Sequence, residues 1–209
     1  MKNIPRYFLL IFLYDLIILF LEKILKIKEM SYSYLAERLT RSQLKEMSNL
    51  HDKTKLINYG IFPLFILFKT LIIASIIYIG AFFYSKSGVT LKNIWNSVIN
   101  AEFILLLVPI FKIIWFYFFQ TNYTLEDLQF FYPLSAINIT GYNGLEPWLI
   151  YPLQTLNLFE VAYIIYLSYQ IGYLTKTNAD NGLKIVSFSY IPALLLWVTV
   201  VMFFTLNYS

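Results

Sequence analysis

The sequence predicts an all-α fold, a polytopic membrane bundle of about five membrane-embedded helices with a further N-terminal helix at the interface. Of the 209 residues, 59% are hydrophobic and only 13% are charged, which is too apolar for an ordinary soluble domain of this length. Several apolar stretches also reach about 18 residues or more, the length that a membrane-spanning helix needs. We therefore expect an integral protein of a bacterial inner (cytoplasmic) membrane.

The composition excludes several classes of functional site. The chain has no cysteine and one histidine, which rules out thiol catalysis, iron–sulfur clusters and cysteine-based zinc sites. It also has neither a phosphate-binding glycine loop nor an HExxH motif. The net charge of +4 is typical of the positive-inside rule and does not indicate nucleic acid. We predict no catalytic residue, metal or cofactor.

Residues 1–56 form the first predicted region, which begins with an apolar stretch at 7–21. At 1.5 Å per residue this stretch covers about 22 Å, short of the roughly 30 Å hydrocarbon core. Lysines flank it on both sides, and Asp15 lies on one narrow polar stripe with Glu22, Lys26 and Glu29. We predict a helix in the cytoplasmic interface, with a full crossing as the alternative.

The rest of this region, residues 22–56, is polar and carries eight Lys or Arg against five Asp or Glu. That excess of positive charge indicates a cytoplasmic location. Thr40 and Gln43 have the spacing of a capping box, so a short helix is expected from about 41 to 50.

Residues 57–209 form the predicted membrane domain. Its strong apolar segments are 57–84, 98–119, 148–174 and 183–206. A weaker one, 125–142, has Thr124 as a helix cap with Glu126 and Asp127 in the first turn. Its short apolar run favours a re-entrant segment, whereas the distribution of Lys and Arg favours a crossing. We expect a crossing at 125–142, which together with the four strong segments makes five.

Three charged residues lie within about one turn of the centres of these segments: Lys69, Lys112 and Glu160. Gln154 and Asn157 precede Glu160 at intervals of three residues, so a continuous helix would carry them as one polar band. We predict an intramembrane polar cluster of these five residues, because ionised groups facing lipid lack compensation. Glu160 would pair with Lys69 or Lys112, or it would be protonated and bonded to a Tyr or Asn.

The C-terminal hairpin resembles that of the Yip (Ypt/Rab-interacting-protein) family of polytopic membrane proteins. The shared features are Asn157 and Phe159 in the penultimate helix, Ile171–Gly172 near its end, and "LKIV" at 183–186 opening the last helix. The resemblance implies a non-enzymatic protein with about five membrane helices that acts through protein or lipid partners. The lysines at 69 and 112 depart from the family pattern.

The expected function is therefore a structural or adaptor subunit of a membrane complex, in contact with lipids and another membrane protein. In that case the polar cluster holds helices or a partner in register. The alternative is a small transporter or channel in which Glu160 binds a cation or proton beside a lysine. An enzyme is not expected, because the usual catalytic pairs are missing.

Overall fold

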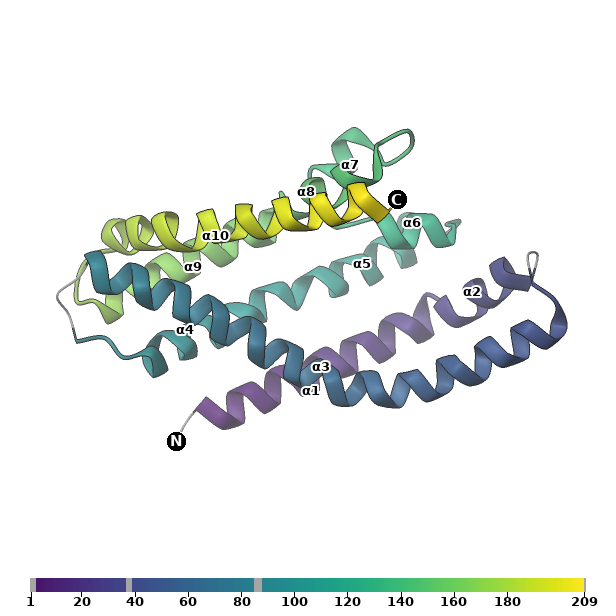
Figure 1. Cartoon of the computed structure of the whole chain (residues 1–209), viewed down its shortest axis with the longest axis horizontal. Coiled ribbons are helices and arrows are strands. Elements are labelled where there is room, and N and C mark those ends of the chain that lie inside the picture. Colours follow the sequence, from purple (N-terminus) through teal and green to yellow (C-terminus); the bar gives the residue numbers. More distant parts are fainter. Residues whose placement is uncertain (1–2, 37–38, 85–87, 209) are drawn as a thin grey trace.

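The computed structural model describes residues 3–36, 39–84 and 88–208, and this part of the chain is helical without β-strands (Figure 1). The all-α prediction is confirmed. The helices are α1 (Asn3–Ile24), α2 (Ile27–Ala36), α3 (Arg41–Tyr84), α4 (Leu91–Leu105), α5 (Leu107–Phe118), α6 (Leu125–Phe130), α7 (Ile137–Thr140), α8 (Pro147–Thr155), α9 (Leu158–Leu174) and α10 (Ala179–Tyr208).

Three stretches of the described chain are long and apolar enough to cross a membrane. They are Gly60–Tyr84 in α3, Leu91–Phe118 across α4 and α5, and Ala179–Asn207 in α10. Helices α4 and α5 are separated only at Leu106, three residues before Pro109, which lacks the N–H that would bond the Leu105 carbonyl in a regular helix. These stretches support an integral membrane protein.

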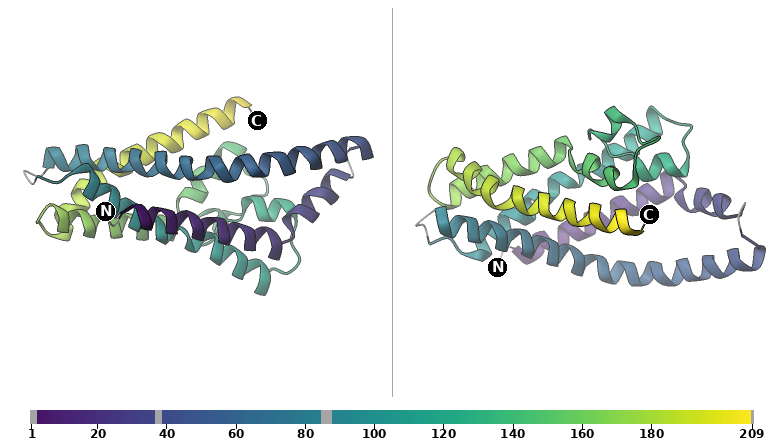
Figure 2. Two further views of the ribbon diagram at one scale, coloured as in Figure 1. Left: turned by 90° about the horizontal axis from the view of Figure 1, so that it is seen from below. Right: turned by 45° about the horizontal axis from the view of Figure 1, so that its top comes forward.

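The long helices lie side by side along the long axis of the molecule (Figures 1 and 2). Helix α9 packs against α10 and α4, and α10 also packs against α3. The largest buried cluster lies between these four helices and includes Ile77, Val98, Tyr163 and Val186. By contrast, α2 and the first half of α3 form a hairpin that projects beyond the bundle (Figure 2).

Helix α1 is part of this bundle and packs against α4, α5 and α3. Leu10 is fully buried and joins Ile17 in a second apolar cluster with Ile66 of α3. The Tyr7 hydroxyl donates a hydrogen bond to the Pro63 carbonyl. Residues 7–21 therefore pack against other helices along their length. The prediction of an interfacial helix did not include this packing.

Helix α3 contains 44 residues. The short helix predicted at 41–50 begins where expected, and the Thr40 N–H donates to Oε1 of Gln43 over 3.0 Å. It then continues without a break into the apolar segment predicted at 57–84, so the predicted regions 1–56 and 57–209 share one helix.

Besides segment 98–119, which is interrupted at Leu106, two further predicted membrane segments are not continuous helices. Segment 148–174 is divided into α8 and α9 at Leu156 and Asn157. Segment 125–142 contains only α6, of six residues, and α7, of four, around a loop in which Leu134 has φ of 53°. A helical crossing at 125–142 is therefore not present, because neither helix approaches the roughly 20 residues that a crossing needs.

Candidate functional site

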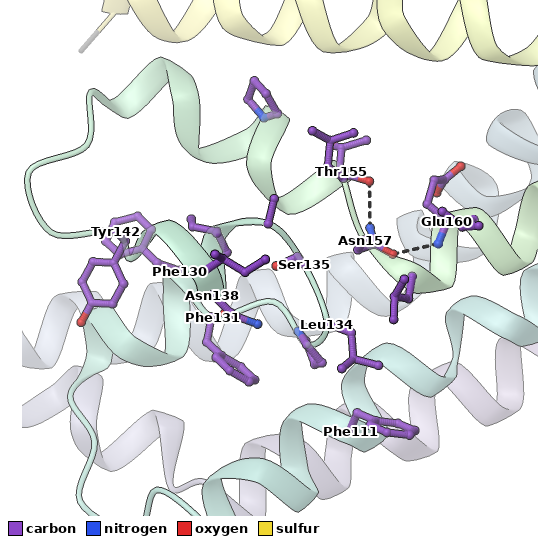
Figure 3. Close-up of a pocket in the computed structure, with 18 of the residues that line it drawn as sticks. Phe111, Phe130, Phe131, Leu134, Ser135, Asn138, Tyr142, Thr155, Asn157 and Glu160 are labelled. Atoms are coloured by element: carbon purple, nitrogen blue, oxygen red, sulfur yellow. Dashed lines mark hydrogen bonds between the residues drawn. The ribbon is translucent and has the colours of Figure 1, made fainter.

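The break between α8 and α9 places Glu160 in the first turn of α9 rather than in the middle of a helix. Asn157 is the N-cap, with extended φ and ψ of −139° and 159°, and its Oδ1 accepts the Glu160 N–H over 2.8 Å. Its amide donates to the Thr155 carbonyl at 3.0 Å (Figure 3) and to the Gln154 carbonyl at 2.9 Å. Asn157 thus satisfies backbone groups on both sides of the break.

A second non-helical stretch stabilises this break. The Ala136 N–H donates to the Leu156 carbonyl over 2.9 Å, and the Leu158 N–H donates to the Leu134 carbonyl over 3.1 Å. Ser135 and Asn157 therefore face each other as an isolated antiparallel bridge. Non-helical backbone inside a membrane protein is tolerated where protein groups satisfy it, and here two irregular stretches do so for each other.

The partner of Glu160 is a tyrosine from α10. The Tyr190 hydroxyl donates to Oε1 of Glu160 over 2.6 Å. A lysine partner was one of two predicted arrangements, and neither Lys69 nor Lys112 bonds to Glu160. The other predicted arrangement was a protonated Glu160 bonded to Tyr or Asn; the bond from Tyr190 agrees with that choice of partner, and the protonation stays a prediction.

Lys69 instead pairs with Glu102, a residue that the sequence reasoning missed. The Lys69 Nζ lies 2.8 Å from Oε2 of Glu102, whose side chain is 0% exposed while that of Lys69 is 33% exposed. Oε1 of Glu102 accepts a hydrogen bond of 3.2 Å from Tyr163. The available signal was a carboxylate near the start of the apolar segment 98–119, a position easily taken for the polar end of a helix.

These two carboxylates belong to one series of buried and half-buried polar groups. The rings of Tyr163 and Tyr190 are in contact, with centroids 5.6 Å apart. We name the series Lys69–Glu102–Tyr163–Tyr190–Glu160 the polar chain. Hydrogen bonds connect it on either side of the tyrosine pair, and a ring contact joins the two halves.

The other predicted site residues lie apart from the polar chain. Lys112 donates to the Leu128 carbonyl, and Gln154 donates to the Phe130 carbonyl over 2.9 Å. Both therefore hold the α6 region against the bundle. Asp15 is half-buried on α1. The structure thus distributes the predicted cluster over several sites, with Asn157 and Glu160 adjacent.

A large pocket lies beside the break in the helix (Figure 3). Its volume is about 1100 Å³, and its walls come from α5, the α6–α7 region, the α8–α9 break and α10. Most of the lining is apolar, and the charged residues among its described lining are Asp127 and Glu160. Glu160 therefore belongs to both the polar chain and the pocket.

Asp127 also lines this pocket and is anchored by its neighbours. Its side chain completes the predicted cap of α6 with Thr124 and also accepts a 2.6 Å hydrogen bond from Tyr142. Although burial raises the pKa of Asp127, hydrogen bonds from Tyr142 and Thr124 outweigh this and hold the pKa below its usual range. Asp127 is therefore negatively charged at neutral pH.

Within the described residues, no group of three or more His, Cys, Asp or Glu side chains is placed to hold a metal ion. Comparison of the chain with protein-family models, curated proteins and solved structures finds no match. The resemblance to the Yip family therefore stays a prediction.

Proposed function

We propose that the protein is a small membrane carrier in which Glu160 binds a proton and the adjoining pocket binds the substrate. The observation that carries this proposal is that one carboxyl group belongs to both the polar chain and the pocket wall. Protonation of Glu160 then changes the charge of the substrate site directly.

The cost of the polar chain supports a functional role. Ionisable groups within membrane segments are expensive to bury, and they commonly mark ion or proton pathways. Lys69 and Glu102 compensate each other, whereas Glu160 is bonded to a neutral tyrosine. The helix break adds to this argument, because discontinuous helices form the substrate sites of many transporters.

The proposal includes a membrane topology of five crossings. They are α1, the apolar part of α3, α4–α5, α8–α9 and α10, with α6 and α7 folded back between two of them. Because the chain has no cysteine, single introduced cysteines report the topology without background. A membrane-impermeant maleimide should label Gly88→Cys and Asp180→Cys from one side and Asn122→Cys from the other. Labelling of Asn122→Cys and Asp180→Cys from the same side would refute a crossing by α8–α9.

The carrier function is tested by currents that follow a rapid pH change at liposomes on a solid-supported membrane. Proton binding within the membrane should produce a transient current in the wild-type protein, reduced at least fivefold in Glu160→Gln. Glu126→Gln serves as the matched control, because Glu126 is exposed and lies outside the pocket lining. A wild-type current no larger than that of protein-free liposomes, or full amplitude in Glu160→Gln, would refute the proposal.

A second candidate is an adaptor subunit, and the projecting α2–α3 hairpin favours it. Tyr32, Met47 and Leu50 on this hairpin are all more than two-fifths exposed, and exposed apolar groups beyond a bundle suit a protein partner. Pull-down of the tagged protein in a gentle detergent, read by quantitative mass spectrometry, tests it. One membrane protein recovered in near-equal amount, and lost with Leu50→Lys, would support the adaptor. Recovery of the tagged protein without a second membrane protein would contradict the adaptor function.

A further inference from the structure

The volume and lining of the pocket indicate the class of molecule that it takes. A volume of about 1100 Å³ is just above the roughly 300–1000 Å³ that is usual for pockets of organic ligands, and it far exceeds the roughly 30 Å³ of one water molecule. We infer that the pocket binds a lipophilic organic cation. This inference rests on the proposed carrier function and names the substrate of the same site.

The charge of the lining favours a cation. Both charged residues of the described lining, Asp127 and Glu160, are acids. Lys112 belongs to α5, but its amine bonds to the Leu128 carbonyl and it is not a lining residue. Lys69 is paired with Glu102. An anionic ligand would therefore meet negative charge without a compensating cation in the pocket lining.

The aromatic walls favour a cation with an apolar body. Phe111, Trp115, Phe130 and Phe131 all line the pocket, and Trp115 stacks on Phe131 with ring centroids 5.4 Å apart. Faces of aromatic rings attract cations and offer apolar contact at the same time. In Figure 3 the phenylalanines lie between Tyr142 at one side and Glu160 at the other, so apolar surface separates the two polar ends.

Glu160 can exchange a proton for this cation. Tyr190 donates to Oε1, and no described residue donates a hydrogen bond to Oε2. A protonated Glu160 that meets the cation would release its proton to water, leaving a carboxylate beside the cation. One positive charge enters the site as another leaves, so the net charge of the site does not change. Such coupling makes the carrier an exchanger of protons for organic cations.

The test compares two ions of the same shape and opposite charge, tetraphenylphosphonium and tetraphenylborate. Equilibrium dialysis with the purified full-length protein in detergent should show saturable binding of tetraphenylphosphonium alone. Glu160→Gln should weaken that binding at least tenfold and Asp127→Asn about threefold, while Glu126→Gln leaves it unchanged. Circular dichroism and thermal unfolding of each variant establish that it is folded. Should Glu160→Gln fail to fold, the Asp127→Asn result decides the matter.

The possible failures are distinguishable. Equal binding of the two ions, or undiminished binding in both pocket variants, would overturn the inference. Tightly retained phospholipid with no tetraphenylphosphonium binding would overturn it as well. If the proton current of the wild-type protein persists in any of these cases, the carrier proposal survives and only the substrate class is wrong. Selective cation binding without a proton current would instead refute the carrier and leave a binding protein.

Discussion

Loss of the Lys69 charge should destabilise the bundle strongly, because it leaves Glu102 without its cation. Glu102 is 0% exposed, and after Lys69→Met its remaining donor is the Tyr163 hydroxyl at 3.2 Å. Removal of one partner of a buried ion pair costs about 3–5 kcal/mol, most of it from the charge left behind. Methionine keeps an unbranched apolar side chain, so lost packing contributes little.

The double variant Lys69→Met/Glu102→Gln separates charge from packing. It removes both charges, so the free energy of unfolding should be higher than in Lys69→Met alone. Contacting residues show coupling energies of about 0.5–3 kcal/mol in such cycles. Lys92→Met is the matched control, since Lys92 is exposed in the first turn of α4 and should cost less than about 0.5 kcal/mol.

Unfolding is measured by titration with SDS in mixed micelles, using the fluorescence of the four tryptophans. A cost below about 1 kcal/mol for Lys69→Met, or strictly additive costs in the double variant, would refute the argument that Glu102 needs this cation.

Three further predictions concern the α9–α10 hairpin, the break between α8 and α9, and the hydrogen bond between Tyr142 and Asp127. A Cβ at Gly182 would overlap the Ser168 carbonyl of α9, whereas one at Gly88 meets nothing within 4 Å. Gly182→Ala should therefore lower the free energy of unfolding by about 1–3 kcal/mol, and Gly88→Ala should leave it unchanged. The same SDS titration measures both variants. Asn157→Ala removes the α9 cap and leaves two carbonyls without their amide donor, which should cost about 2 kcal/mol and increase hydrogen exchange in the first turn of α9. Tyr142→Phe removes a hydrogen bond that lowers the pKa of Asp127, so NMR titration should show that this pKa rises. The ionised Asp127 stabilises the fold at pH values above its pKa in the unfolded chain, and this stabilisation is lost as the pH falls through its pKa in the folded protein. The variant should therefore lose the stabilisation at a higher pH. An unchanged Asp127 titration would contradict the last prediction.

Local features of the site were accessible from the sequence. Thr124 and Asp127 form the expected cap of α6, because the spacing of a capping box depends only on neighbouring residues. The long apolar stretches likewise formed helices, since burial of the backbone in an apolar environment requires internal hydrogen bonds.

The sequence by itself determined that the chain is helical, that it is apolar enough for a membrane, and that Glu160 is a carboxylate in apolar surroundings. Only the tertiary structure decided which groups satisfy that carboxylate and its neighbours. Helical spacing identifies the residues that share a face but not the helix that packs against that face. The sequence therefore did not reveal that Lys69 pairs with Glu102 and that Tyr190 donates a hydrogen bond to Glu160. The break at Asn157 had the same origin, because a residue able to cap a helix does so only where partners such as residues 134–136 satisfy the freed backbone.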